Sequence, residues 1–385
     1  KVTVSVLYWK ISVDRSMRAV ARATAAVVLL CIAAAVTARP PTAAELTSSY
    51  TYAKYLADFR KRAPATPAEY AQREALFAEE LAAVLQHNAD TTQLYRQGVN
   101  RFSDWTIEEK SRVLMAPGRD AFLRSQRREG GRLSADQLAA VKSAAADGSA
   151  TKPIRPSVDY RRSDPPVLTA VKDQGYCGAC WSFATAETVE AHAAIKTGKL
   201  FSLSMQQMIS CVPNVTLVIA NLPPDNRTET KIMEGCDGYW PTFAIDYVVG
   251  HQGGAMTQEW EIPFQSYFAQ INASAPQYKP VPACMNSADR IGDDVNVTGY
   301  TMLPRNDPVE TENTIFTQGP LIAVIDVPQS LMAYEAGIYA GAECMNNDFM
   351  SPAHAVQIVG YGHDASAQAD YWIVRNSCGT TWGES

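Results

Sequence analysis

The sequence lacks the features that mark nucleic-acid-binding, nucleotide-binding and metal-binding proteins. Its 34 basic residues are outnumbered by 40 acidic ones, and it has no basic run or aromatic-basic stripe, which argues against a nucleic-acid partner. It has no phosphate-binding glycine loop, no internal repeat, and no histidine and cysteine cluster with metal-ligand spacing. What it does have is 46% hydrophobic residues, enough for one or two real cores. A globular chain without a metal or organic cofactor is therefore expected.

The N-terminus has the pattern of a targeting segment. Residues 17–38 are predicted to be a signal peptide, because a basic start after Met17 precedes the apolar stretch 25–36 and a small-residue cleavage site before Arg39. The apolar stretch is too short to span a bilayer, so no stable membrane insertion is expected. Residues 1–16 contain no methionine and are interpreted as a non-native upstream extension. The chain is therefore expected to enter the secretory pathway and to reach a lysosome-like compartment or the outside of the cell.

The most informative segment is a glutamine and two cysteines that lead into a predicted helix. Gln174 stands shortly before Cys180, and a helix-forming stretch follows over 182–196. The partial positive charge of a helix N-terminus favours a thiolate at Cys180. A thiolate can attack a carbonyl, and the Gln174 amide can donate a hydrogen bond to the resulting oxyanion. The segment therefore predicts a thiol nucleophile with a nearby oxyanion donor.

A histidine and an asparagine near the C-terminus have the chemistry to complete this site. Residues 353–362 and 371–374 read as two strands around a polar loop. In an antiparallel hairpin about that loop, residues whose numbers sum to about 730 lie opposite each other, which makes His354 and Asn376 neighbours. An asparagine amide beside an imidazole can fix the orientation and tautomer of the ring without adding charge. The hairpin therefore supplies a base and a group that orients it.

Residues 39 to about 150 read as a helical segment that follows the predicted signal peptide. Apolar side chains recur with helical spacing over 52–59, and a second helix is predicted after Thr66, which can cap it, with a proline at its first position and Glu69 completing a capping box. Along this second helix six residues share one face, and Glu69 and Arg73 are spaced for an i, i+4 ion pair. The six are Glu69, Arg73, Phe77, Glu80, Val84 and Asn88. Taken alone, the face fits simple helix packing as well as a specific motif.

Together these motifs resemble the papain family of cysteine proteases, and within it the cathepsin L type. The run Cys-Gly-Ala-Cys-Trp at 177–181, followed far downstream by His354 and Asn376, is similar to the family signature. The helical face resembles the Glu-Arg-Phe-Asn-Ile-Asn pattern of the family's propeptides, and residues 98–104 resemble their Gly-Asn-Phe-Asp motif. The resemblance covers roughly residues 50 to 385.

The resemblance implies an α+β, papain-like fold of two lobes. A helical lobe would carry Cys180, an antiparallel β-barrel lobe would carry His354 and Asn376, and a helical prodomain would precede both. The chain is then expected to divide into the upstream extension 1–16, the signal peptide 17–38, an inhibitory propeptide and linker 39–152, and a C-terminally truncated peptidase domain 153–385, with processing between about 133 and 156.

By the same resemblance the chain is a cysteine endopeptidase made as a self-inhibited zymogen. Cys180 would form a thioester acyl-enzyme with the substrate, and His354 would serve as base and then as acid. Asn376 would orient His354, and Gln174 would donate to the oxyanion. Protein or peptide substrates are expected, with the propeptide as an intramolecular inhibitor and the enzyme as a monomer.

The resemblance also implies how the cysteines are used. Two disulfides are expected, Cys177–Cys236 and Cys211–Cys284, with Cys180 free, in keeping with an oxidising compartment. Cys344 is expected to lack a partner, because the family's third bridge ends beyond Ser385. Four Asn-X-Ser/Thr sequons are expected to be glycosylated: Asn214, Asn226, Asn272 and Asn296. The long segment 212–235 is interpreted as an inserted surface loop.

Seven residues are expected by resemblance to contact the substrate: Gly238, Tyr239, Trp240, Pro241, Val324, Ala355 and Trp382. Four of them, Trp240, Pro241, Val324 and Ala355, would line an apolar main specificity pocket. Tyr239 stands where a second glycine is usual in the family, which predicts a narrowed or reshaped cleft. Cys378 stands where a tryptophan usually shields the contact between the histidine and the asparagine from water.

Two other functions fit parts of the sequence. Cys177 and Cys180 alone resemble a redox pair of a secreted thiol–disulfide oxidoreductase, and such a pair can also bind zinc. This reading accounts for neither Gln174 nor the propeptide motifs. The departures at Tyr239 and Cys378 instead fit a catalytically inactive papain-like homologue that acts as a binding protein.

Overall fold

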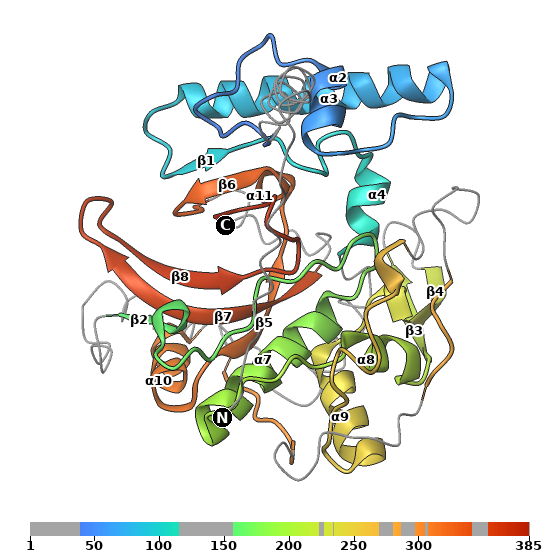
Figure 1. Ribbon diagram of the computed structural model, residues 1–385, viewed down its shortest axis with the longest axis vertical. Helices are drawn as coiled ribbons and strands as arrows, with labels where there is room; N and C mark the ends of the chain where they lie inside the picture. Colours follow the sequence, from blue (N-terminus) through green and yellow to red (C-terminus); the bar gives the residue numbers. More distant parts are fainter. Residues whose placement is uncertain are drawn as a thin grey trace, which may run out of the picture.

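The prodomain lies across one end of a helical lobe and a β-sheet lobe in the computed structural model (Figure 1). The described residues are 39–114, 157–222, 227–233, 235–268, 280–285, 297–304, 307–340 and 353–384. The predicted signal peptide, linker and processing region lie outside them, as do Cys344 and the sequons at Asn226, Asn272 and Asn296. Within the described residues, no helix has the length and apolar character needed to cross a membrane.

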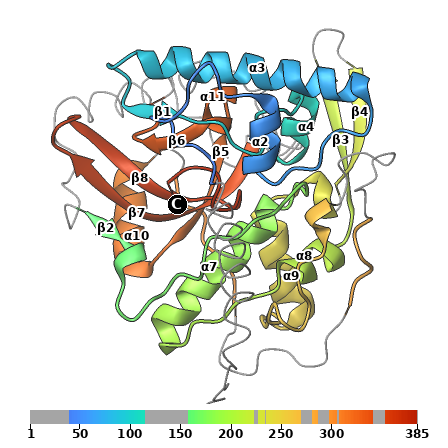
Figure 2. The same cartoon turned by 45° about the horizontal axis from the view of Figure 1, so that its top comes forward.

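The described part of the prodomain contains the long helix α3 (Pro67–Ala89) and three short elements, α2 (Tyr52–Asp58), β1 (Tyr95–Gln97) and α4 (Ile107–Arg112). The predicted start of α3 is confirmed, because the Thr66 hydroxyl accepts a hydrogen bond from the Glu69 N–H at 3.1 Å. Figure 2 shows α3 running along the top of the molecule, with α2 below it. Between the two helices lies an aromatic cluster of Tyr50, Tyr52, Tyr55 and Phe77.

Arg73 joins α3 to α4 and does not pair within α3. The predicted Glu69–Arg73 ion pair is wrong, because Arg73 pairs with the Glu109 carboxylate and donates to the Asp104 carbonyl at 2.9 Å. Glu69 accepts instead from the Ala65 N–H at 3.1 Å. Glu109 is partly buried, and its two oxygens accept parallel, charge-assisted hydrogen bonds from Arg73. An ion pair with the exposed carboxylate of Glu69 would be weaker.

The helical lobe is built on α7 (Cys180–Thr197), with α8 (Met205–Cys211) and α9 (Pro241–Gln252) packed against it. α7 begins two residues before the predicted start at Ser182. The insertion over 212–235 contains a hairpin of β3 (Val215–Leu222) and β4 (Arg227–Met233), so it has more regular structure than the expected loop. Short 3-10 turns occupy Gly235–Asp237 (η3) and Ser266–Phe268 (η4).

The second lobe is an antiparallel sheet centred on β7 (Ala353–Asp364). β7 pairs with β2 (Val158–Asp159), β5 (Leu321–Asp326) and β8 (Ala369–Arg375). The remaining elements of this half are η2 (Tyr160–Arg162), α10 (Pro308–Gln318), α11 (Gln329–Met332) and β6 (Tyr334–Gly337). The α+β, two-lobed class predicted from the sequence is confirmed.

The predicted C-terminal hairpin is confirmed with a small shift in register. Paired residues of β7 and β8 have numbers that sum to 732 at the Gln357–Arg375 pair and to 733 after a bulge that follows Ile358. The shift places His354 and Asn376 just beyond the last pair of this ladder. On its other side, His354 is opposite Ile325 of β5, which holds its backbone in the sheet.

Strand pairing, apolar packing and polar contacts hold the prodomain on the lobes. β1 pairs antiparallel with β6, and among the described strands β6 has no other partner. The apolar packing is one buried cluster in which Phe102, Trp105, Val113 and Leu114 of the prodomain pack with Val327, Met332 and Cys378. Arg101 adds an ion pair across this boundary, with Asp173 at 2.5 Å. The prodomain therefore covers the surface between the lobes.

Candidate active site

Cys180 opens α7 and faces β7 of the other lobe. Its side chain is fully buried, and its Sγ accepts a hydrogen bond from the Ala355 N–H at 3.4 Å. Ala355 directly follows His354, so the sulfur lies beside the histidine. In the described part of the chain, no side chain caps the N-terminus of α7, which leaves its free N–H groups to favour negative charge next to Cys180.

His354 and Asn376 are joined as the hairpin predicts. The Asn376 Oδ1 atom lies 2.8 Å from His354 Nε2. An amide oxygen only accepts hydrogen bonds, so Nε2 carries the proton and Nδ1 is the basic nitrogen of the neutral ring. Nδ1 is buried and has no hydrogen-bond partner among the described residues. Asn376 Oδ1 is itself fixed by the Ser377 N–H at 2.7 Å.

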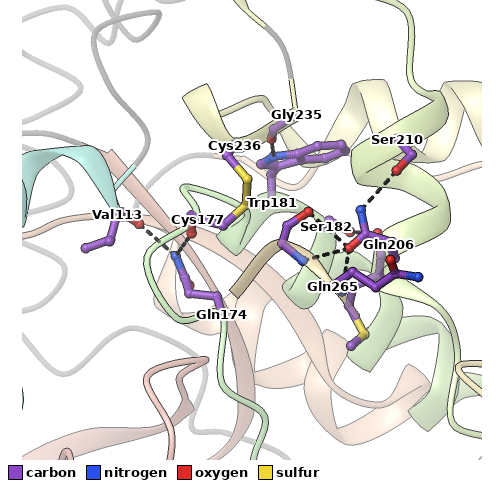
Figure 3. The surroundings of a disulfide bond; sticks show 12 residues. Val113, Gln174, Cys177, Trp181, Ser182, Gln206, Ser210, Gly235, Cys236 and Gln265 are labelled. Atoms are coloured by element: carbon purple, nitrogen blue, oxygen red, sulfur yellow. Dashed lines mark hydrogen bonds between the residues drawn. A yellow bond between two sulfur atoms is a disulfide. The ribbon is translucent and has the colours of Figure 1, made fainter. Parts of the chain in front are cut away.

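The Gln174 amide is held between two backbone carbonyls (Figure 3). Its Nε2 donates to the Cys177 carbonyl at 2.9 Å and to the Val113 carbonyl of the prodomain at 2.7 Å. Its Oε1 accepts a hydrogen bond from the Ser377 hydroxyl at 2.5 Å. This bond orients the amide so that its NH2 group faces the prodomain. A donor suited to an oxyanion is therefore in place and is occupied by a carbonyl of the prodomain.

Burial keeps both reacting groups neutral in this covered state. Removal from water raises the pKa of Cys180 to about 12, against the hydrogen bond from Ala355. Removal from water also lowers the pKa of His354 to about 4, against the hydrogen bond to Asn376. Between these two values the thiol keeps its proton and the imidazole is uncharged. A thiolate–imidazolium pair is therefore disfavoured while both groups are buried.

The cysteines within the described residues form two disulfides and two free thiols. Cys177 is bonded to Cys236 and Cys211 to Cys284, as the resemblance implies. Cys180 and Cys378 are free and buried. Because Cys177 is bonded to Cys236, it does not form a redox pair with Cys180. Among the described residues, no group of three or more histidine, cysteine or acidic side chains is arranged to hold a metal ion.

The residues expected to contact substrate differ in their surroundings. Val324 is 40% exposed and is paired with the buried Ala355 across β5 and β7. Trp240 and Pro241 are buried at the start of α9, beside Gly238, which has a φ of 92°. Trp382 donates to the Leu331 carbonyl at 3.2 Å.

The side chain of Tyr239, which is expected to narrow or reshape the cleft, lies in the core of the helical lobe. Its ring is fully buried against Trp181 and Phe243, and its hydroxyl donates to the Pro213 carbonyl. The side chain therefore belongs to the core of the helical lobe, where the insertion after Pro213 supplies a polar partner for it.

Sequence reasoning missed the residues by which the prodomain occupies the site. Val113 acts through its carbonyl, which no side-chain pattern marks. The Arg101–Asp173 ion pair joins distant segments, and Ser377 resembles any serine after a strand. The position of Ser377 next to Asn376 is the one signal that could have identified it.

Comparison with known protein families matches residues 154–385 to the papain family cysteine proteases. The chain belongs to the papain family of cysteine proteases. Residues 52–109 match the cathepsin propeptide inhibitor domain (I29), so the N-terminal unit is an inhibitory propeptide. The protein is a papain-like cysteine endopeptidase with the organisation of a self-inhibited zymogen. Nothing in these matches favours an oxidoreductase or an inactive homologue.

Individual relatives agree with this family. Fruit bromelain of Ananas comosus is 30% identical over 316 residues, which are 82% of this chain and 73% of the relative. Pro-cathepsin H of Bos taurus is 29% identical, covering 82% of this chain and 77% of its own. Among solved structures, digestive procathepsin L 3 of the Tenebrio molitor larval midgut has a TM-score of 0.61 at 26% identity, covering 86% and 89% of the two chains.

Proposed function

We propose that Cys180, His354 and Asn376 form the catalytic group of this endopeptidase, with Gln174 as an oxyanion donor. The observation that carries the proposal is the 2.8 Å contact between His354 and Asn376 beside a thiol that is kept out of both disulfides. The free Nδ1 of His354 is the atom left to exchange a proton with the sulfur.

The reaction follows from these positions. Once the site is uncovered, the Cys180 thiol passes its proton to His354 Nδ1, and the thiolate attacks the scissile carbonyl. The oxyanion accepts hydrogen bonds from Gln174 Nε2 and from the Cys180 N–H, each contributing about 3–4 kcal/mol in comparable sites. His354 protonates the leaving amine, and then activates a water that hydrolyses the thioester. Asn376 keeps the ring oriented through both steps.

The prodomain inhibits by occupying the place of the substrate. The Val113 carbonyl accepts from Gln174 Nε2, which is the bond that an oxyanion would take. Val113 and Leu114 also lie in the buried cluster with Cys378, which is two residues after Asn376. Removal of the prodomain therefore frees the oxyanion donor and admits water to Cys180. We place the processing site between about 133 and 156, in the linker.

Labelling with an epoxide cysteine-protease probe tests these roles. The zymogen is expected to react at least about tenfold more slowly than the processed enzyme, because its Cys180 is a buried thiol. Cys180→Ala should abolish labelling of the processed chain, whereas Cys378→Ala is the matched control for the other free thiol and should retain it. Adducts that persist in Cys180→Ala, located by mass spectrometry, would contradict the assignment of the nucleophile.

The main specificity pocket is proposed to be apolar. Val324 offers an exposed apolar side chain, and its partner Ala355 contacts Cys180 through its backbone. Peptides with leucine two positions before the cut are expected to have a kcat/KM about tenfold or more above that of peptides with lysine there. Val324→Asp should reduce this ratio, and the exposed Val374→Asp on β8 should not. Equal cleavage of both peptides by the unchanged enzyme would exclude the pocket.

The cellular setting is also a proposal. Two disulfides suit an oxidising compartment, and Asn214, an exposed sequon before β3, is accessible for glycosylation. These features support a secretory-pathway enzyme. We propose further that it works as a monomer in a lysosome-like compartment or outside the cell.

A further inference from the structure

An arginine of the prodomain binds a carboxylate directly beside the proposed oxyanion donor. The Nη1 atom of Arg101 lies 2.5 Å and 2.6 Å from the two carboxylate oxygens of Asp173, the residue before Gln174. Its Nη2 atom donates to the carbonyl of Gly175, the residue after Gln174, at 3.4 Å. The guanidinium therefore bonds to both sequence neighbours of the residue that would stabilise the oxyanion.

The peptidase domain itself holds the Asp173 carboxylate in place. Asp173 Oδ1 accepts a hydrogen bond from the Gly175 N–H at 2.8 Å. Gly175 approaches Tyr267 so closely that an added Cβ would lie 2.4 Å from the Tyr267 carbonyl oxygen, and the hydroxyl of this tyrosine donates to the Asp173 carboxylate. On the other side, a Cβ on Gly379 would lie 2.8 Å from Asp173 Oδ2. None of these contacts depends on the prodomain, so the carboxylate stays oriented after processing.

Processing leaves this carboxylate without a counter-charge. Among the described residues, Arg101 is the one basic side chain that pairs with Asp173. The adjacent Lys172 pairs with Glu190 at 2.8 Å and with Glu259 at 3.5 Å. Asp173 is 35% exposed even with Arg101 in place. Departure of the prodomain therefore uncovers a carboxylate that no basic side chain in the described part of the peptidase domain neutralises.

Asp173 lies on the side of the cleft from which the leaving group departs. It forms an antiparallel bridge with Cys378, two residues after Asn376. In the proposed mechanism His354 protonates the departing amine, so the peptide that leaves starts beside His354 and Asn376. The proposed pocket for the residue two positions before the cut is elsewhere, at Val324 on β5.

The distance from Asp173 to the reacting bond suits the first residues after the cut. Asp173 is one residue, about 3.8 Å along the chain, from Gln174. An extended peptide advances about 3.3 Å per residue, so one or two residues of a substrate cover this distance. A side chain at either position can then reach the carboxylate.

We propose that Asp173, Tyr267 and the Gly175 carbonyl form a subsite for an arginine side chain at the first or second position after the cut, and that Arg101 fills this subsite in the zymogen. The inference rests on the proposed catalytic group. Arginine fits better than lysine because its planar guanidinium can bond to both carboxylate oxygens and to the carbonyl at once, as Arg101 does. The subsite makes proteins with a basic residue just after the scissile bond the favoured substrates.

Cleavage of internally quenched peptides by the processed enzyme tests the proposal. The peptides carry leucine two positions before the cut and differ only in the first two residues after it. Arginine at one of these positions should give a kcat/KM about tenfold above that of glutamate, with lysine between the two. The difference should shrink as the ionic strength is raised, because Asp173 is partly exposed.

Two variants of Asp173 and one matched control complete the test. Asp173→Asn keeps an acceptor for the Gly175 N–H and should bring the arginine-to-glutamate ratio to within about twofold of one. Asp173→Lys should reverse the preference. Each ratio is taken within one enzyme preparation, so it does not depend on the fraction of correctly folded protein. Glu259→Gln removes a carboxylate that is also 35% exposed, and it should keep the arginine preference.

Two results would overturn the subsite. One is equal cleavage of the arginine and glutamate peptides by the unchanged enzyme, and the other is an arginine preference that persists in Asp173→Asn. Either would show that the pair of Arg101 and Asp173 serves only to dock the prodomain. Hydrolysis that survives Cys180→Ala would instead overturn the catalytic assignment on which the subsite rests.

Discussion

Replacing His354 with alanine is expected to lower kcat about 10²–10⁴-fold, with a much smaller effect on KM. Alanine leaves the Cys180 thiol without the free Nδ1 that takes its proton, and leaves the departing amine without an acid. Because such a chain does not process itself, its prodomain is removed with an added protease before the assay. Steady-state hydrolysis of a peptide substrate then gives kcat and KM separately.

His363→Ala provides the matched control. His363 also lies on β7, but its side chain is 52% exposed and contacts only Asp370, at 2.7 Å, among the interactions described. Its loss should leave kcat within about twofold, as for most exposed positions. If both variants lost activity to the same extent, damage to the sheet would explain the result and the assignment of His354 as the base would fail.

Replacing Phe77 with alanine is expected to end the latency of the zymogen. Phe77 is 2% exposed, and the centroid of its ring lies 4.6 Å from the centroid of the Tyr55 ring. The rings of Tyr50 and Tyr52 also contact it. Loss of this side chain should destabilise the prodomain by about 3–5 kcal/mol, because it opens a cavity in a small core. The fraction of uncovered sites should rise by roughly 10²-fold or more. Peptide hydrolysis by the unprocessed chain at neutral pH measures this fraction directly.

The control for Phe77 is Ile107→Ala, at a side chain of the same prodomain that is 58% exposed. It should leave latency intact, and full latency in the Phe77 variant would show that docking does not depend on the aromatic cluster.

The assay is run at neutral pH because acid also destabilises the prodomain. Burial alone would raise the pKa of Glu109, but the hydrogen bonds from Arg73 and from the Thr106 N–H, together with the positive charges of Arg73 and Lys61, outweigh it and hold the pKa below its ordinary value. The contribution of that pair is therefore lost as the pH falls through the lowered pKa.

The elements of the proposed catalytic site are predictable because each depends on a local pattern. The helix after Cys180 is marked by a run of helix formers, and the hairpin of His354 and Asn376 by two apolar runs around a polar loop. The start of α3 is marked by its cap at Thr66. Such signals do not require knowledge of the rest of the fold.

The contacts of the prodomain are not predictable in this way, because they join residues far apart in sequence. Arg73 has a suitable partner four residues away and takes Glu109 instead, which only the packing of α3 on α4 makes available. The register of β7 and β8 depends on a bulge that the alternating pattern does not reveal. Tyr239 is placed in the core by the insertion that precedes it, a choice set by tertiary structure.

The pairing of β1 with β6 has a consequence for the course of activation. β1 is the only strand that pairs with β6 in the described part of the chain. When the prodomain leaves, the backbone N–H and C=O groups of β6 lose their partners, and β6 becomes an unpaired edge strand. A released prodomain fragment that still contains residues 95–97 can pair with β6 again. Such a fragment would inhibit the newly processed enzyme. Activation should then accelerate as the enzyme digests its own released fragments.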